Sequence, residues 1–289
     1  MPLKDLIEKS IYIIREAAAQ FKNPALLWST GKDSTTMLSL IRESFYGEIP
    51  WPVIHIDTGK KFKEIYEFRD NLAKEWGIKL IITKNEEALK KDMSPVNTSR
   101  FECCTALKTI ALQNVIRDRG FDAIIVSIRR DEHGIRSKER YMSPRDRDFR
   151  WRVYRERFDG DSGLEALQDT ELSGWGIFES DFGPETNHVR VHPLLHWTEL
   201  DVWRYVKERN LPFNPLYRAD YVEKAYGVSE RRYRSLGCRP CTNPIVSKAS
   251  TIDEIVREIM LSNEEERAGR AQDKESMYTM EQLRALGYM

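Results

Sequence analysis

Short apolar runs alternate with amphipathic stretches in the first half of the chain, and this pattern constrains the fold most strongly. Four apolar runs are typical of buried strands: 25–28, 53–56, 79–82 and 123–128. Four other stretches have the spacing of amphipathic helices: 3–20, 37–41, 62–76 and about 105–118. Because β and α alternate, we predict an α/β fold with a doubly wound, mostly parallel sheet and helices on both faces. Such sheets bind ligands beyond the carboxyl ends of their strands.

The middle of the chain loses this periodicity. From about 130 to 190 the sequence is charged and rich in glycine, which predicts long loops, with a flexible loop at about 145–187. A strand is expected at 189–191. A helix is expected to start at Thr198, with Asp201 as the acid of its capping box.

The C-terminal part contains clustered prolines and glycines, which predict an irregular segment before the last helices at about 251–262 and 279–286. We therefore predict two regions. Residues 1–195 form the α/β domain, and residues 196–289 form a helical and irregular region that carries a Cys-x-x-Cys pair.

The composition balances 46 Lys and Arg residues against 46 Asp and Glu residues, so the formal net charge is zero. A neutral chain has no overall field that attracts nucleic acid or a membrane surface. Acidic residues interrupt the apolar stretches of the N-terminus, which argues against a signal peptide or a membrane span. We expect a cytoplasmic protein without a membrane partner, which meets nucleic acid only through another protein.

A phosphate-binding turn is predicted directly after the first apolar run, at Ser29-Thr30-Gly31-Lys32-Asp33-Ser34. In such a turn, small residues let backbone N–H groups converge on an anion, and the following helix N-terminus adds a favourable partial charge. Gly31 is expected to permit the sharp turn and Lys32 to supply charge, while the hydroxyl groups donate hydrogen bonds. The spacing of a Walker A motif is absent, which disfavours a P-loop kinase or GTPase. The alternative is an ordinary serine-capped turn.

Further polar residues follow two later apolar runs. The run at 53–56 leads into Asp57-Thr58-Gly59, whose carboxylate is a candidate ligand for Mg²⁺ or a ribose hydroxyl. The run at 123–128 leads into a basic cluster: Arg129, Arg130, Arg136, Lys138 and Arg140. These cations follow a strand, so they are placed to reach a triphosphate from the carboxyl edge of the sheet.

Positive charge at that edge would stabilise the α-phosphate and the departing pyrophosphate in adenylyl transfer. The candidate catalytic residues are therefore Lys32, Arg129, Arg130, Lys138 and Arg140. Acidic residues are interleaved with the basic ones, so the alternative is a solvated, salt-bridged surface.

The four cysteines form two tight pairs, Cys103-Cys104 and Cys238-Arg239-Pro240-Cys241. This is not the scattered pattern of a secreted disulfide framework, and in a reducing compartment it suggests metal or redox chemistry. Four thiolates are the right number for a [4Fe–4S] cluster or a structural zinc, if the fold brings the pairs together. The alternatives are a disulfide or buried free thiols.

The chain resembles known families at these motifs. Ser29 to Ser34 resembles the signature of PP-loop ATP pyrophosphatases, and Asp57-Thr58-Gly59 resembles the second-strand motif of the phosphoadenylyl-sulfate reductase family within them. Residues 129–132 and 137–140 resemble the small catalytic subunits (subunit 2) of two-component sulfate adenylyltransferases. The cysteine pairs are similar to the cluster-binding pattern of adenylyl-sulfate reductases, which those subunits typically lack.

The resemblance implies an enzyme that binds ATP and Mg²⁺ and cleaves ATP between its α- and β-phosphates. The first interpretation is a sulfate adenylyltransferase that joins ATP and sulfate, releases pyrophosphate and works with a GTPase-type partner subunit. The second is an iron–sulfur ATP pyrophosphatase that activates a nucleic acid for sulfur incorporation, in DNA phosphorothioation or tRNA thiolation, with a sulfur-donor protein.

A reductase of adenylyl sulfate or phosphoadenylyl sulfate is the third interpretation. Reductases carry a further nucleophilic cysteine near the C-terminus, and no cysteine follows Cys241 in this sequence. If all four cysteines bind a cluster, no thiol remains to accept the sulfonyl group. A non-enzymatic binding module is the remaining class, and a homo-oligomer is compatible with all of them.

Overall fold

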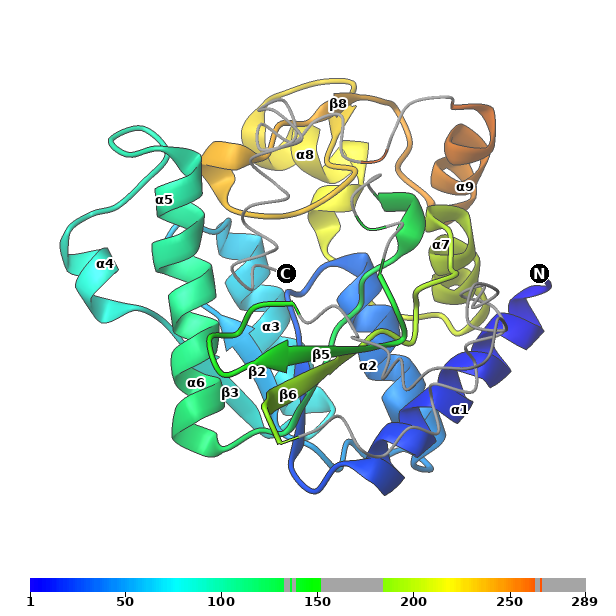
Figure 1. Cartoon of the computed structure of the whole chain (residues 1–289). Helices are drawn as coiled ribbons and strands as arrows, with labels where there is room; N and C mark the ends of the chain where they lie inside the picture. The colour runs from blue at the N-terminus through cyan, green and yellow to red at the C-terminus, as the bar shows by residue number, and fades with distance from the viewer. Residues whose placement is uncertain (133–135, 137–138, 152–183, 263–265, 267–289) are drawn as a thin grey trace, which may run out of the picture.

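A computed structural model describes residues 1–132, 136, 139–151, 184–262 and 266. Its main sheet has six strands: β1 (Pro24–Leu27), β2 (Val53–Ile56), β3 (Leu80–Thr83), β4 (Ala123–Ile125), β5 (Met142–Asp146) and β6 (Thr186–Val191). Their spatial order is β3-β2-β1-β4-β6-β5, and all neighbours are parallel except β5 and β6 (Figure 1).

Helices cover both faces of this sheet, so the predicted doubly wound, mostly parallel α/β fold is confirmed (Figure 1). In chain order they are α1 (Leu3–Gln20), α2 (Lys32–Ser44), α3 (Lys63–Glu75), α4 (Glu86–Lys90), α5 (Arg100–Cys104), α6 (Ala111–Arg119), α7 (Glu199–Glu208), α8 (Ala219–Tyr226) and α9 (Ile252–Leu261). A π-helical segment, Thr105–Ile110, joins α5 to α6. Among the described residues, no helix combines the length and the apolar character that a membrane span requires.

The central strands are apolar throughout because both faces of the sheet are buried. In β1, Leu26 belongs to a core that also contains residues of α1, α2 and α7. Its neighbours Ala25 and Leu27 belong to the core formed with α6. Successive side chains of a strand point to opposite faces, so each strand contributes to both cores. The carboxyl ends of these strands are thereby held rigidly, and the functional loops begin there.

Helices from both sides of the predicted boundary at residue 195 share one core. Residues of α1 and α7 belong to the same buried cluster, and Trp197 donates a hydrogen bond from Nε1 to Ser10 Oγ at 2.9 Å. The Thr198 capping box with Asp201 is present as expected. The division into two regions stays a prediction, but the part that follows residue 195 packs directly against the first helix.

The prediction of loops from about 130 to 190 was wrong for residues 142–146, which form the edge strand β5. Their sequence has no apolar alternation, and the strand exists because it pairs with β6, with Ser143 opposite Arg190. The segment expected to be irregular also contains α8 and a small sheet of β7 (Arg231–Arg232) and β8 (Ile245–Val246). The expected helix at 279–286 and most of the expected flexible loop lie outside the described residues.

Candidate active site

A cavity of about 160 Å³ opens at the carboxyl ends of β1, β2 and β4. These three strands are adjacent, with β1 in the middle, so the loop that follows β1 lies at the centre of the site. Residues 235–238 and Glu266 also line the cavity. The sheet edge predicted to bind a ligand is therefore the one that carries a cavity.

The turn at 29–34 joins β1 to α2, as expected for a phosphate-binding turn. The hydroxyls of Ser29 and Ser34 are 3.0 Å apart, and the backbone N–H of Lys32 donates to the Tyr217 hydroxyl at 3.0 Å. The expectation that Gly31 permits the turn was wrong. Gly31 has an ordinary φ of −74°, and Thr30 carries the left-handed φ of 67°.

A left-handed backbone is costly for a β-branched residue and is retained mainly at functional sites. Thr30 satisfies its hydroxyl by donating to the carbonyl of Ser29. A Cβ atom on Gly31 would lie 3.5 Å from Ser29 Oγ and 3.5 Å from the Tyr217 hydroxyl. Since neither distance is a clash, the glycine serves to leave space in front of the turn, where an anion would approach the backbone.

Two fully buried cations, Lys32 and Arg129, meet at this turn. A single carboxylate, Glu266, bridges them: Oε1 accepts from Lys32 Nζ and Oε2 accepts from the Arg129 guanidinium. Asp33 also contacts both, with Oδ2 3.3 Å from Lys32 Nζ and Oδ1 2.6 Å from Arg129 Nε. Glu199 lies 3.9 Å from Lys32 Nζ. Lys32 and Arg129 are thus neutralised by Asp33 of the turn itself and by carboxylates from later segments.

Electrostatics keep these groups charged. Burial lowers the pKa of Lys32, but the carboxylates of Asp33, Glu266 and Glu199 outweigh burial and raise the pKa above its ordinary value. Burial raises the pKa of Glu266, but Lys32 and Arg129 outweigh it and hold the pKa well below the ordinary value. Glu266 therefore occupies, as an anion, the position where Lys32 and Arg129 could jointly bind a phosphate.

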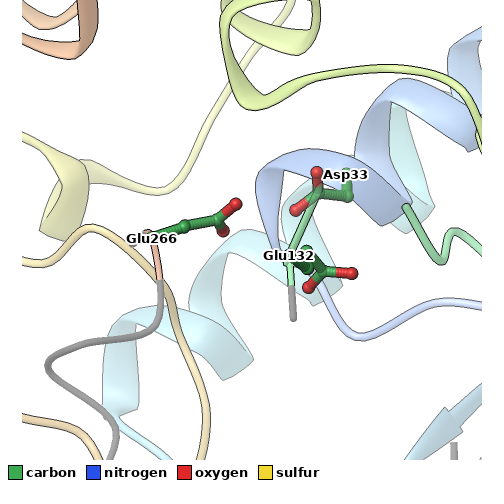
Figure 2. Close-up of side chains that lie close together, drawn as sticks. All are labelled: Asp33, Glu132 and Glu266. Carbon is green, nitrogen blue, oxygen red and sulfur yellow. The ribbon is translucent and has the colours of Figure 1, made fainter. Parts of the chain in front are cut away.

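Three carboxylates come together at this place, from α2, from the turn after β4 and from the segment after α9 (Figure 2). They belong to Asp33, Glu132 and Glu266, and their oxygen atoms lie within 4.8 Å of one another. Oxygen ligands of this kind suit Mg²⁺. The other candidate, Asp57, is used differently: its Oδ1 accepts hydrogen bonds from Gly59 N at 2.9 Å and from the Tyr66 hydroxyl at 2.8 Å.

The basic residues after β4 differ in what they contact. Arg129 and Arg136 reach the site, where Arg136 lines the cavity and pairs with Glu132. Arg130 instead contacts His196 Nε2 at 2.8 Å and the carbonyl of Glu139 at 3.2 Å.

The two remaining candidate catalytic residues are Arg140 and Lys138. The carbonyl of Arg140 accepts a hydrogen bond from His192 Nδ1 at 2.7 Å, and Lys138 lies outside the described residues. The catalytic roles assigned to the basic cluster stay predictions.

The motif at 57–59 shapes the β2 side of the cavity. Gly59 has a φ of +64°, and a Cβ there would lie 2.9 Å from Leu89 Cδ2, so this position requires glycine. Thr58 lines the cavity, and its Oγ1 lies 3.2 Å from the Cys238 sulfur. The strand-end motif and the second cysteine pair are therefore neighbours in space.

The four cysteines are free and buried, so the structure has thiols and not the alternative disulfide. Burial, together with the thiols of Cys104, Cys238 and Cys241, raises the pKa of Cys103 to about 11. The two pairs, 134 residues apart between Cys104 and Cys238, are thus in one electrostatic neighbourhood. A metal centre bound by both pairs stays a prediction.

Sequence reasoning missed several residues of the site. Glu266, Glu199 and Tyr217 come from segments after β6, and no local motif connects them to the turn at 29–34. Lys61 also lines the cavity, and it follows Asp57-Thr58-Gly59 by only two positions. Its closeness to a strand-end motif was a signal that could have identified it.

The fold and the cavity are those of a doubly wound α/β protein whose candidate site lies at the turn after its central strand β1. The chain matches the phosphoadenosine phosphosulfate reductase domain over residues 23–244. It is 37% identical to the sulfate adenylyltransferase subunit 2 of Shewanella loihica, over 99% of this chain and 97% of that one. It is 38% identical to the protein of that name from Aeromonas salmonicida, over 99% of this chain and 95% of that one.

The chain therefore belongs to the phosphoadenosine phosphosulfate reductase domain family and, within it, to the sulfate adenylyltransferase subunit 2 proteins. This confirms the family that the motifs indicated. Solved structures agree on the fold. A phosphoadenylyl-sulfate reductase from Candida auris aligns with a TM-score of 0.53 at 16% identity, over 84% of this chain and 96% of that one. An FMN adenylyltransferase from Candida glabrata aligns with a TM-score of 0.54 at 17% identity, over 99% and 84%.

Proposed function

We propose that this protein is the catalytic subunit of a sulfate adenylyltransferase, which transfers the adenylyl group of ATP to sulfate and releases pyrophosphate. The observation that carries the proposal is the buried pair Lys32 and Arg129 at the 29–34 turn, bridged by one carboxylate. Two such cations, fixed at a helix N-terminus, suit an anion with several oxygens. The subunit 2 relatives supply the substrate class.

In this reaction one oxygen of sulfate attacks the α-phosphorus, and the bond from that phosphorus to the oxygen bridging to the β-phosphate breaks. Pyrophosphate leaves with the bonding electrons. Sulfate is a dianion at neutral pH, so no base has to remove a proton from it. Lys32, Arg129 and Arg136 stabilise the departing charge, because they are preorganised by their carboxylate partners.

Asp33 and Glu132 are the residues that would hold Mg²⁺, because their carboxylates lie together and Asp33 contacts both Lys32 and Arg129. The bound ion would neutralise charge on the phosphates of ATP. Glu266 completes the group of three in the ligand-free protein. When ATP binds, phosphate oxygens replace the Glu266 carboxylate on Lys32 and Arg129. Glu266 therefore competes with the nucleotide for the same two cations.

The four cysteines fit a [4Fe–4S] cluster better than a zinc ion. Tetrahedral zinc, with Zn–S distances of about 2.3 Å, holds its sulfurs roughly 3.8 Å apart. Among the described residues, the cysteine sulfurs do not form a group of three within 4.8 Å. The thiolates of a cubane cluster lie farther apart. Cys103, Cys104, Cys238 and Cys241 would hold this cluster, which supplies a redox-active or structural centre beside the cavity.

Subunit 2 proteins imply a partner subunit, and we propose a GTPase-type partner that couples the uphill formation of adenylyl sulfate to nucleotide hydrolysis. The test is pyrophosphate release by the full chain, purified anaerobically and combined with that partner, ATP and Mg²⁺. Release that depends on sulfate is the expected result. If sulfate has no effect on the rate of pyrophosphate release, the proposed function is wrong.

One observation favours a second function, because Cys238 lines the ATP cavity. An iron–sulfur ATP pyrophosphatase that activates a nucleic acid for sulfur incorporation would place its cysteines in this position. The neutral net charge opposes direct nucleic-acid binding. Pyrophosphate release that requires a nucleic acid and a sulfur donor, instead of sulfate, would establish this alternative.

A further inference from the structure

The β2 side of the cavity carries a lysine whose contacts differ from those of the other cations. Lys61 is half-buried and lines the cavity, and its Nζ lies 3.1 Å from His55 Nε2. His55 Nδ1 lies 3.0 Å from the carbonyl oxygen of Trp28, which can only accept a hydrogen bond, so Nδ1 carries the hydrogen. Nε2 is therefore the acceptor, and Lys61 donates to it.

This partner is neutral. Burial, with Lys61 and Arg69 nearby, lowers the pKa of His55 to about 2, so the imidazole carries no charge. Among the described residues, no carboxylate lies within 4.0 Å of Lys61 Nζ. By contrast, Lys32 and Arg136 each pair with a carboxylate. A neutral acceptor uses one ammonium hydrogen of Lys61 and leaves its charge to be balanced by something else.

The position of Lys61 matches the geometry of the reaction. Lys61 follows β2, Arg129 follows β4, and the turn at 29–34 follows β1, which lies between those two strands. An in-line displacement places the attacking oxygen opposite the leaving group. If the β1 turn and the Arg129 side hold pyrophosphate, the acceptor must approach from the β2 side. Lys61 lies on this side and is held by a neutral acceptor, while Lys108 of the π-helical segment also lines the cavity.

We propose that Lys61 binds the oxyanion that accepts the adenylyl group, a tetrahedral dianion of the sulfate type, with His55 positioning the ammonium group. This inference rests on the proposed function and assigns the acceptor subsite within it. In this step an oxygen of the acceptor forms the bond to the α-phosphorus, and the bond from that phosphorus to the departing pyrophosphate breaks. The role of Lys61 is to donate a hydrogen bond to the acceptor oxyanion and to place positive charge beside it.

A second role for Lys61 must be distinguished by experiment. Lys61 forms a backbone bridge with Cys238, so it could instead balance the charge of metal-bound thiolates. That role would change the iron content or the absorption spectrum when Lys61 is replaced. The acceptor role would change the response to sulfate and leave the spectrum as it is.

The test uses the full chain with its partner subunit and compares Lys61→Met, Lys61→Arg and Lys60→Met. Lys60 is the matched control, because it is adjacent and pairs with Asp92. Loss of a charged hydrogen bond to a small anion predicts a KM for sulfate about 10- to 100-fold higher in Lys61→Met. The KM for ATP should change less than about twofold, Lys61→Arg should recover most of the sulfate affinity, and Lys60→Met should behave as wild type.

A binding measurement separates failure of this inference from failure of the proposed function. Sulfate is titrated calorimetrically into the full chain with α,β-methylene-ATP, which cannot be cleaved at the bond in question. Binding by the wild type that weakens at least about tenfold in Lys61→Met supports the inference, whether or not turnover with sulfate is seen. Equal sulfate binding by the wild type and Lys61→Met overturns the inference. A wild type that binds no sulfate also overturns it. So does a Lys61→Met variant that has lost its iron.

Discussion

The two sides of the cavity balance charge in opposite ways. On the side of β1 and β4, the buried Lys32 and Arg129 are paired with carboxylates, above all with Glu266. On the β2 side, Lys61 donates to a neutral imidazole beside the cysteines. The first side therefore binds an external anion only by exchanging an internal one. The second side has a positive charge that an external anion can balance directly.

This difference in charge balance would let one small site bind two anions, a phosphate on the β1 and β4 side and an acceptor on the β2 side. Exchange of Glu266 for a phosphate replaces one charge-assisted contact with another, so the cations stay buried and aligned throughout. An acceptor on the β2 side needs no such exchange.

The largest effect is expected for Lys32→Met. Lys32 is fully buried at the phosphate turn, and removing one preorganised charge that stabilises a leaving group costs about 10²- to 10³-fold in kcat. Steady-state pyrophosphate release measures this. Lys60→Met, a change of the same kind on the β2 side, should leave the rate within about twofold.

The Lys32→Met protein must be shown to fold, since three carboxylates each lose one of their cationic partners. Circular dichroism and the melting temperature with and without ATP provide that check. A folded variant with a rate within about tenfold of wild type would show that Lys32 does not stabilise the departing pyrophosphate.

Cysteine replacement tests the neighbourhood of the β2 side. Cys103→Ser and Cys241→Ser, one from each pair, should each reduce the iron content from about four per chain to less than about one and remove the visible absorption. In the proposed cluster both pairs contribute ligands, so the two single variants should be equally affected. Iron and zinc analysis after anaerobic purification measures this. A wild-type protein that is colourless and free of iron refutes the cluster.

Glu266→Gln tests the internal anion. The substitution keeps the size and removes the charge, so ATP no longer displaces a carboxylate from Lys32 and Arg129. We expect ATP to bind about tenfold more tightly, which corresponds to about 1.4 kcal/mol, and the ligand-free protein to melt at a lower temperature. Titration calorimetry and thermal melting measure the two effects. Glu258→Gln is the matched control, because Glu258 pairs with Arg232 and should affect stability alone.

The Glu266→Gln variant also tests how the stability of the protein depends on pH. The pKa of Glu266 is lowered in the folded protein, so its charge stabilises the fold above the ordinary glutamate value of about 4.3. That contribution is lost progressively as the pH falls below 4.3. The stability difference between wild type and Glu266→Gln should therefore be constant near neutral pH and shrink on acidification. A difference that grows below pH 4 would contradict the ion pairs.

The smallest effects separate the two glycines. Gly59→Ala should cost about 1–2 kcal/mol of stability, because its φ is +64° and the new Cβ would lie 2.9 Å from Leu89 Cδ2. Gly31→Ala meets no such contact and should change the free energy of unfolding by less than about 0.5 kcal/mol. It should weaken ATP binding instead. Urea unfolding and ATP titration of both variants reveal any reversal of this pattern.

Much of the fold could be predicted from the sequence, because its signals are local. The strand at 53–56, the helix at 3–20 and the capping box at Thr198 depend on neighbouring residues and occur where expected. Strand β5 could not be predicted, since its residues 142–146 form a strand only through pairing with β6. Its position depends on a contact about 45 residues away in sequence, which periodicity does not detect.

The residues of the candidate site also differ in whether a local sequence motif identifies them. The turn at 29–34 and the four cysteines were visible as motifs, because their chemistry resides in residues that are adjacent in sequence. Glu266 was not visible, since its role depends on reaching Lys32 over 234 residues. The role expected of Gly31 also changed, because which residue adopts a left-handed φ is decided by the packing of the whole turn.

The sequence by itself determined the family, the parallel sheet and the strand ends from which the functional loops arise. Only the tertiary structure decided which charges meet there: Glu266 on Lys32 and Arg129, and a neutral His55 on Lys61. The physical reason is that a charge interaction depends on distance and burial in three dimensions. Those quantities exist only after segments from both ends of the chain have packed around the central strands.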